Sequence, residues 1–302
     1  MRAGALMLRL QLPAIFTLLL YGGEARVTNP FIGVTHIERS EDSPRKVSLH
    51  IVKIDLTSAG ISFKLTAPSG SRETVRQTTL DFLKQTKAQI ALNGHFFVPY
   101  PSTDIDSFLV GLAAAEGNVY SDFEEPAQSY AIVANAPALN LSEDNQASII
   151  SKTTTTKIWN AISGSAQIIT SGVATVPVYK DEQHPEGLLT PGGPGNYSNS
   201  KSWYDVPNAR TVIGLSADNK TLFLFTVDRA AGSLGLKLNE IAGFLIVEYG
   251  VANALNLDGG GSTTLAMQDP STGEASIVNK SADNPNGRAV ASNIAIFAKT
   301  EE

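Results

Sequence analysis

The sequence contains no cysteine among its 302 residues, so disulfide bonds, thiolate metal sites and cysteine nucleophiles are all excluded. It has no excess of basic charge either, because 23 lysines and arginines stand against 29 aspartates and glutamates. This balance predicts no nucleic-acid partner, since such partners are recognised by basic patches. Hydrophobic residues make up 42% of the chain, as in ordinary globular proteins. We therefore expect a large core that is held together without covalent cross-links.

Several catalytic motifs are also missing. The chain has four histidines but no HExxH pattern, no Gly-x-Ser-x-Gly elbow and no repeated carboxylates of a calcium loop. These absences argue against zinc hydrolysis, an esterase triad and a dedicated calcium site. We therefore predict no metal and no cofactor.

Long hydrophobic runs are confined to the N-terminus. Arg2 and Arg9 precede an apolar run over residues 10–20, and small residues follow this run. The pattern is typical of a secretory signal peptide and falls short of a membrane span. We predict a signal peptide over residues 1–25, one mature domain over residues 26–302, and a secreted or periplasmic location with no membrane span in the mature protein.

Apolar periodicity predicts a strand-rich α+β fold. Helical spacing occurs over residues 72–87 and 238–250, the second segment with Asn239 as N-cap and Gly250 at its C-terminus. We expect mixed sheets packed by a few helices in one compact domain, and a division into two lobes is left open. We also expect residues 47–56 and 61–67 to form an early hairpin, and residues 210–216 and 221–228 to form a later one. Strands are predicted over residues 47–56, 61–67, 88–93, 129–134, 147–151, 165–170, 210–216, 221–228, 252–258 and 290–297.

Residues 180–209 form the longest segment rich in proline, glycine, asparagine and serine. Loops of this length are often lids or binding loops, and a domain linker is the alternative. Tyr197, Trp203 and Tyr204 lie in this segment, and their rings could stack on the face of a sugar. We therefore predict a lid over a carbohydrate site.

The segment "NLDGGGSTT", over residues 256–264, places Asp258 before Gly259, Gly260 and Gly261. Consecutive glycine amides at a strand end can converge on an anion, and the missing side chains let a ligand approach the backbone. The segment lacks the lysine of a P-loop and follows a helix, which argues against a nucleoside triphosphate. A glycine-rich hairpin without a ligand is the alternative. Asp258 could act as a base, a nucleophile or a metal ligand, or could cap the turn.

Two arginines and one further aspartate stand near expected strand ends. Arg210 opens the strand after the long loop, and Arg288 follows the turn-rich segment "SADNPNG". Arginine grips phosphate through two parallel hydrogen bonds, whereas the commoner fate of a single arginine is a solvated surface position. Asp228 closes the strand "TLFLFTVD", where its carboxylate could face a site.

The segment "ALNGHFF" places Asn93 and His95 after a buried strand and before Phe96 and Phe97. A lone histidine is more often structural than catalytic, and we expect the two phenylalanines in the core. The strand resembles the one that ends at Asp258, because each follows a helix and closes on Asn-Gly or Asp-Gly. Two related halves would bring Asn93 and Asp258 close together, although chance similarity explains the pattern equally well.

The segments "NGHFF", "RTVIGLS", "LNEIAGFLIVEYGVANALNLDGGGSTTL" and "NGRAV" resemble the phosphodiester glycosidase family over about residues 93–297. The resemblance implies an extracytoplasmic hydrolase that cleaves the glycosidic C–O bond of an α-glycosyl 1-phosphodiester, with an N-acetylglucosamine-like sugar. The resemblance also implies that the functional site contains Asn93, Arg210, Asp258, the three glycines and Arg288. Animal members have cysteines and a membrane anchor, so we expect a bacterial secreted branch with another target, such as an exopolysaccharide.

The residues and the resemblance together give one chemical hypothesis. A phosphate monoester can leave already charged, so the site needs a cationic clamp more than it needs an acid. The alternatives are a non-catalytic phosphoglycan-binding protein and a metal-dependent phosphodiesterase that cuts the P–O bond. The sequence indicates neither the stereochemical course nor the oligomeric state. The candidate catalytic residues are Asp258, Asn93 and Asp228, and the candidate substrate contacts are Arg210, Arg288, Gly259, Gly260, Gly261, Ser262 and His95.

Overall fold

The computed structural model describes residues 23–123, 130–190, 192–193, 195, 197–280, 282 and 284–300. Most of the predicted signal peptide lies outside these residues, and its last two residues, Glu24 and Ala25, belong to the first strand. No helix in the described part of the chain is long and apolar enough to cross a membrane. The division into a signal peptide and a mature domain therefore stays a prediction.

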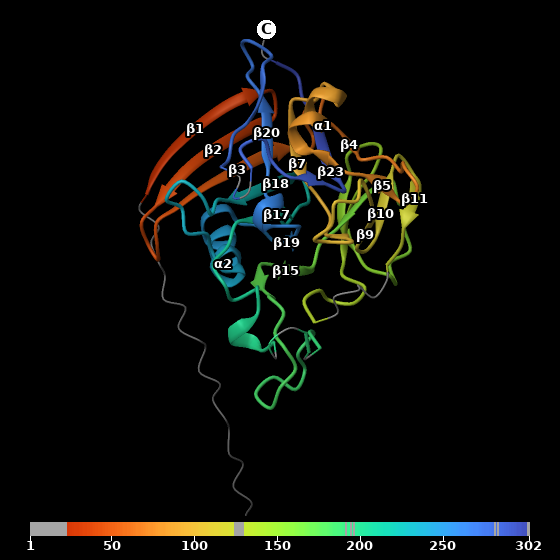
Figure 1. Cartoon of the computed structure of the whole chain (residues 1–302). Helices are drawn as coiled ribbons and strands as arrows, with labels where there is room; N and C mark the ends of the chain where they lie inside the picture. Colours follow the sequence, from red (N-terminus) through yellow and green to blue (C-terminus); the bar gives the residue numbers. More distant parts are fainter. Residues whose placement is uncertain are drawn as a thin grey trace, which may run out of the picture.

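Eight antiparallel strands form the largest sheet, in the order β1-β2-β3-β18-β17-β19-β15-β16 (Figure 1). These strands are β1 (Glu24–Phe31), β2 (Val34–Glu41), β3 (Val47–Asp55), β18 (Thr221–Val227), β17 (Arg210–Leu215), β19 (Asn253–Asn256), β15 (Ala166–Thr170) and β16 (Val173–Ala174). β17 and β19 lie at the centre of this sheet, and both lead into the candidate site.

Two five-stranded sheets complete the body of the domain. The second sheet has the order β21 (Ala275–Ile277), β20 (Leu265–Gln268), β7 (Ile90–Asn93), β23 (Asn293–Phe297) and β4 (Ser62–Leu65). The third has the order β11 (Asn118–Ser121), β10 (Ala113–Ala115), β14 (Asn160–Ser163), β12 (Ala138–Leu141) and β13 (Ala147–Ile150). Smaller sheets join β5 (Thr74–Val75), β9 (Asp106–Leu109) and β8 (Phe97–Val98), and pair β22 (Ala289–Val290) with β6 (Gln77–Thr78).

The main core lies between the eight-stranded sheet and the second sheet. Ile54, Leu224 and Leu255 from the first pack in one cluster with Leu92 and Ile294 from the second. Helix α2 (Leu238–Tyr249) covers the other face of the large sheet, and helix α1 (Thr79–Thr86) covers the second sheet. Because the large sheet is covered on both faces, its central strands are apolar without interruption, as in β17, where every residue is buried.

The α+β class and the strand-rich architecture are confirmed. The ladders between described strands are antiparallel, whereas mixed sheets were expected. The hairpin of β17 and β18 is confirmed, with Leu215 opposite Leu222. The early hairpin is wrong, because β3 pairs with β2 and β18 while β4 pairs with β23 in the second sheet. Residues 56–61 carry the chain from one layer of the sandwich to the other.

Both helices were found, but α1 begins at Thr79 instead of residue 72, and the N-cap of α2 differs from the one expected. α1 starts at Thr79, because residues 74–78 are rich in β-branched side chains and pair with β9 and β22, and the Thr78 hydroxyl caps the helix by accepting from the Asp81 amide at 3.0 Å. The N-cap of α2 is Lys237 and not Asn239. The Glu240 carboxylate accepts from the Lys237 amide at 2.8 Å and fixes this start.

One predicted strand is wrong, and the long segment 180–209 has little regular secondary structure, as expected for a loop. Ser129 lies outside the described residues, and residues 130–134 form turns instead of a strand. The neighbouring strand is β12, for which no prediction was made. Residues 153–156 form a turn, and residues 180–209 contain only a short 3-10 helix (Asn199–Lys201) and isolated bridges in their described part.

Candidate active site

A cavity of about 250 Å3 opens beside the segment that follows β19. Its described lining falls into a polar group from strand ends and an apolar wall. The polar group consists of Asn208, Arg210, Asp258, Gly259, Gly260, Gly261 and Arg288. The apolar wall consists of Phe96, Phe97, Val98, Tyr100, Val110, Ile132 and Trp203.

Asp258 is the acidic residue in the described lining of this cavity. Its carboxylate accepts a hydrogen bond from the Gly259 amide at 2.9 Å. Burial raises the pKa of Asp258 to about 7, and the Ser262 hydroxyl, Arg288 and the Gly259 amide only partly offset this effect. A carboxylate with a pKa near neutrality can accept or release a proton under physiological conditions.

Asn93 fixes the backbone on which Asp258 stands. Its side-chain amide donates to the Asp258 carbonyl at 2.7 Å, and its oxygen accepts from the Thr211 hydroxyl at 2.8 Å and the Thr264 amide at 3.0 Å. The side chain is fully buried and does not line the cavity. The structure thus brings Asn93 and Asp258 together, with Asn93 in a positioning role.

The three glycines are explained largely by packing. A Cβ atom on Gly259 would lie 2.9 Å from the Ala209 carbonyl, and Gly260 has a left-handed φ of +60°. Their amides also have acceptors inside the protein, since Gly259 donates to Asp258 and Gly260 donates to the Ala209 carbonyl at 2.9 Å. At most the Gly261 amide remains for an anion, so the expected nest of three amides is reduced to one.

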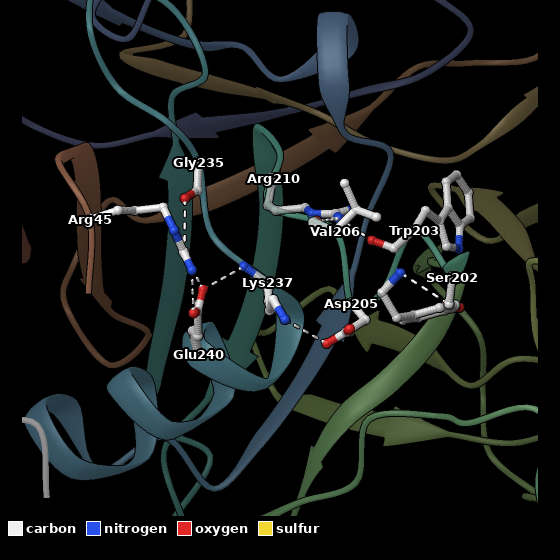
Figure 2. Close-up of polar contacts among 10 residues, drawn as sticks. Arg45, Ser202, Trp203, Asp205, Val206, Arg210, Gly235, Lys237 and Glu240 are labelled. Atoms are coloured by element: carbon white, nitrogen blue, oxygen red, sulfur yellow. Dashed lines mark hydrogen bonds and ion pairs between the residues drawn. The ribbon is translucent and has the colours of Figure 1, made fainter. Parts of the chain in front are cut away.

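Arg210 is a buried cation without an acidic partner among the described residues. Figure 2 shows its side chain reaching from the start of β17 to the carbonyls of Trp203 and Val206, where Nη2 donates to both. Nε has no hydrogen-bond partner, and the side chain lines the cavity although the residue is only 3% exposed. Burial lowers the pKa of Arg210 to about 10, so the guanidinium stays charged at neutral pH. An uncompensated buried charge is costly unless a ligand neutralises it.

Arg288 is the second cation of the cavity. Its Nη1 donates to the Ser262 hydroxyl at 3.1 Å, and its guanidinium lies over the ring of Tyr100, 4.7 Å from the centroid. Because Ser262 also bonds the Asp258 carboxylate, these three side chains form one polar group. Both predicted arginines therefore line the same cavity as Asp258.

Of the three aromatic residues in the predicted lid, Trp203 alone lines the cavity. Its indole donates to the Ala131 carbonyl at 3.0 Å, and its ring packs against Phe96 at a centroid distance of 5.0 Å. Tyr197 packs against other tyrosines, and Tyr204 is buried in the core beside α2.

The loop that carries Trp203 is anchored from two sides. Arg210 binds it from β17, and Lys237 at the start of α2 binds Asp205 at 3.0 Å (Figure 2). Glu240 accepts from the Lys237 amide and from Arg45 at 2.7 Å, which joins α2 to the loop before β3. Trp203 is therefore held in place in this structure.

Besides Asn93 and Ser262, two further candidate residues, His95 and Asp228, do not line the cavity. His95 is fully buried, and its ring nitrogens lie 2.8 Å from the Ser292 hydroxyl and 2.9 Å from the Leu112 carbonyl. Burial lowers the pKa of His95 to about 4, so the ring is a neutral structural group. Asp228 is buried, with a pKa raised by burial to about 6, and accepts from the Asn279 side chain and the Lys280 amide, each at 3.1 Å. Neither residue lines the cavity.

Apart from Trp203, the apolar wall was missed by reasoning from the sequence. Phe97 is buried in an apolar cluster, as expected, but it also lines the cavity, as do Phe96, Val98 and Tyr100 from the same segment. Their closeness in sequence to Asn93 was the available signal. Ile132 had no such signal, because it reaches the cavity through the turns that replace the predicted strand.

The described residues provide few ligands for a metal ion. In the described part of the chain, no group of three or more histidines and acidic residues is gathered closely enough to hold one. Asp258 also has no second carboxylate beside it in the described lining of the cavity.

The matching family model identifies the chain. Residues 86–297, well over half of the sequence, match the model of the phosphodiester glycosidases. The chain belongs to the phosphodiester glycosidase family. Asp258, the two arginines and the aromatic wall all fall within the matched residues, so a glycosidase-type function and a glycan-type substrate are supported. No curated protein matches the sequence.

Three solved structures share the fold of this phosphodiester glycosidase. The catalytic domain of zebrafish N-acetylglucosamine-1-phosphodiester alpha-N-acetylglucosaminidase has a TM-score of 0.61 and 19% identity, over 92% of this chain and 88% of that one. A hypothetical protein from Synechocystis has a TM-score of 0.58 and 14% identity, over 91% of this chain and 64% of that one. A Burkholderia pseudomallei protein, provisionally named as exported, has a TM-score of 0.61 and 12% identity, over 92% of this chain and 97% of that one. Identities this low establish a shared fold only.

Proposed function

We propose that the protein hydrolyses the glycosidic C–O bond of an α-glycosyl 1-phosphodiester with an N-acetylglucosamine-like sugar. The observation that carries the proposal is Arg210, a buried guanidinium that has no acidic partner in the described part of the chain and lines the same cavity as Asp258. A phosphodiester brings one negative charge to this cation and a sugar carbon to the carboxylate. The family to which the chain belongs supports the same reaction class.

Arg210 and Arg288 bind the phosphate in this proposal. Arg210 uses Nη2 to hold the loop at Trp203 and Val206 and its Nε is buried, so Nη1 is the nitrogen left for a ligand. Charge-assisted hydrogen bonds from guanidinium to phosphate are stronger than neutral ones. The bond from C1 of the sugar to the phosphate oxygen breaks, and the phosphate monoester departs with the electron pair of that bond.

Asp258 serves the sugar side of the same bond. Its ionised carboxylate accepts a proton from the attacking water, or stabilises the positive charge that develops at C1. A conventional glycosidase places a second carboxyl group opposite the first to protonate the leaving oxygen. The described lining has none, which agrees with a leaving group that is already charged.

We further propose that the protein acts outside the cytoplasm. The N-terminal segment has the pattern of a signal peptide. The Burkholderia pseudomallei neighbour, named provisionally as exported, agrees with this view. Mass spectrometry of protein recovered from a bacterial periplasm would show whether residues 1–25 are removed, and retention of Met1 would contradict the proposal.

The decisive experiment uses an α-N-acetylglucosaminyl 1-phosphate methyl diester in water labelled with 18O. Cleavage of the C–O bond incorporates the label into the released sugar, as we expect. Label in the phosphate would instead support P–O cleavage by a phosphodiesterase. Saturable binding without product would support a binding protein and contradict the proposed hydrolysis.

A further inference from the structure

Tyr100 marks the place where the cavity meets solvent. It is 47% exposed and is the one exposed residue in the described lining of the cavity. Arg288 lies over its ring and also acts electrostatically on Asp258. The mouth is therefore on the side of the cavity where the second cation stands.

An apolar surface continues from this mouth over the small sheet of β5, β9 and β8. Val98 lines the cavity and lies opposite Phe108 in the antiparallel pair of β8 and β9. Side chains that are opposite in such a pair share a face of the sheet and lie about 5 Å apart. Phe108 is 47% exposed, and Ile105, one residue before β9, is 72% exposed. We call Val98, Tyr100 and Phe108 the rim surface.

Two arginines lie beside the rim surface, and protein atoms hold both. Arg72 lies 5.7 Å from the Phe108 ring centroid and binds Asp104 at 2.9 Å. Arg76 donates to the carbonyls of Pro99 and Ser102. These contacts direct both guanidinium groups to oxygen atoms of the protein, and the half-exposed ring of Phe108 remains for an apolar ligand.

A phosphodiester has two ester substituents, and the cavity has room for one of them. A volume of about 250 Å3 falls below the range of about 300–1,000 Å3 that is typical of drug-sized ligands. A sugar phosphate that fills the cavity must send its second substituent, the aglycone, out through the mouth. That substituent then passes over the rim surface.

We propose that the aglycone carries an alkyl or prenyl chain, so that the natural substrate is a lipid-like glycosyl 1-phosphodiester. This inference rests on the proposed function and adds to it the class of the leaving group. Hydrolysis then releases the free sugar and an alkyl phosphate. Apolar contact with Phe108 and Tyr100 contributes to binding by removing the chain from water.

The test compares three α-N-acetylglucosaminyl 1-phosphate diesters, with methyl, octyl and glyceryl aglycones, below the micelle concentration of the octyl ester. We expect kcat/KM for the octyl diester to exceed that for the methyl diester by about tenfold, the equivalent of nearly two fully buried methylene groups. The higher kcat/KM of the octyl diester should come from a lower KM and not from a higher kcat. Phe108→Ser should bring the octyl value to within about twofold of the methyl value. Val27→Ser, at a 59% exposed position on β1, should leave the preference intact.

The outcomes separate this inference from the proposed function. Failure to hydrolyse any of the three diesters would refute the proposed function itself. Equal turnover of the methyl and octyl diesters, or a preference for the glyceryl diester, would overturn the lipid-like aglycone alone. Loss of methyl turnover in Phe108→Ser would also overturn it, because Phe108 would then support the cavity and not the aglycone.

Discussion

Replacing Asp258 by asparagine should remove activity and add stability. The change keeps the shape of the side chain and an oxygen that can accept from the Gly259 amide. It removes the proton acceptor, so we expect kcat/KM to fall by at least about a hundredfold. The assay is release of free sugar from the methyl diester.

The stability change follows from the raised pKa. With a folded pKa of about 7 against an ordinary value of 3.8, the carboxyl group contributes its full stability below about pH 3.8 and loses it as the pH rises to about 7. The difference corresponds to about 4 kcal/mol at most, and to less where water in the cavity screens the charge. Asp258→Asn should therefore exceed the native protein in free energy of unfolding at pH 8, and match it near pH 4.

Urea unfolding at both pH values measures this difference, and Asp228→Asn is the matched comparison. Asp228 is also buried with a raised pKa but lies outside the cavity, so its asparagine variant should keep turnover and, by the same linkage, should also exceed the native protein in stability at pH 8. The reasoning would be refuted by near-normal turnover in Asp258→Asn, or by equal stability of this variant and the native protein at pH 8.

Two further predictions concern the charges of the site. Arg210→Met should weaken the binding of a sugar 1-phosphate by at least about tenfold in calorimetric titrations, since the guanidinium is buried and has no acidic partner among the described residues; unchanged affinity would remove Arg210 from the phosphate site. The pH profile of kcat/KM should rise between about pH 6 and 8 with a midpoint near 7, because the ionised form of Asp258 is the active one; a profile that falls over this range would make Asp258 an acid.

Local sequence pattern was enough for elements whose partners are neighbours in the chain. The β17 and β18 hairpin and helix α2 were predicted, because apolar periodicity and Gly250 at the helix end are local signals. The pairing of β3 and β4 was not, because each finds its partner far along the chain. Apolar periodicity says that a strand is buried but does not say against which strand it lies.

The polar half of the site could be predicted, and most of the apolar half could not. Asp258, Arg210 and Arg288 have residue types suited to phosphate chemistry, and the structure brings them to one cavity. Trp203 was expected near a sugar because it lies in the long loop, whereas Phe96 looks like an ordinary core residue in sequence, since a cavity wall and a core use the same side chains. The three consecutive glycines were predicted to bind an anion through their amides, but close packing of Gly259 against Ala209 accounts for much of that pattern.

Asn93 has a wider consequence through its three hydrogen bonds. From the end of β7 in the second sheet, its side chain binds Thr211 on β17 of the large sheet, and also Asp258 and Thr264 in the segment between β19 and β20. The acidic group therefore has its position only while both layers of the sandwich are docked. A fragment that retains a single layer would keep the residues of the pocket and lose their alignment, so this domain cannot be divided into smaller working parts.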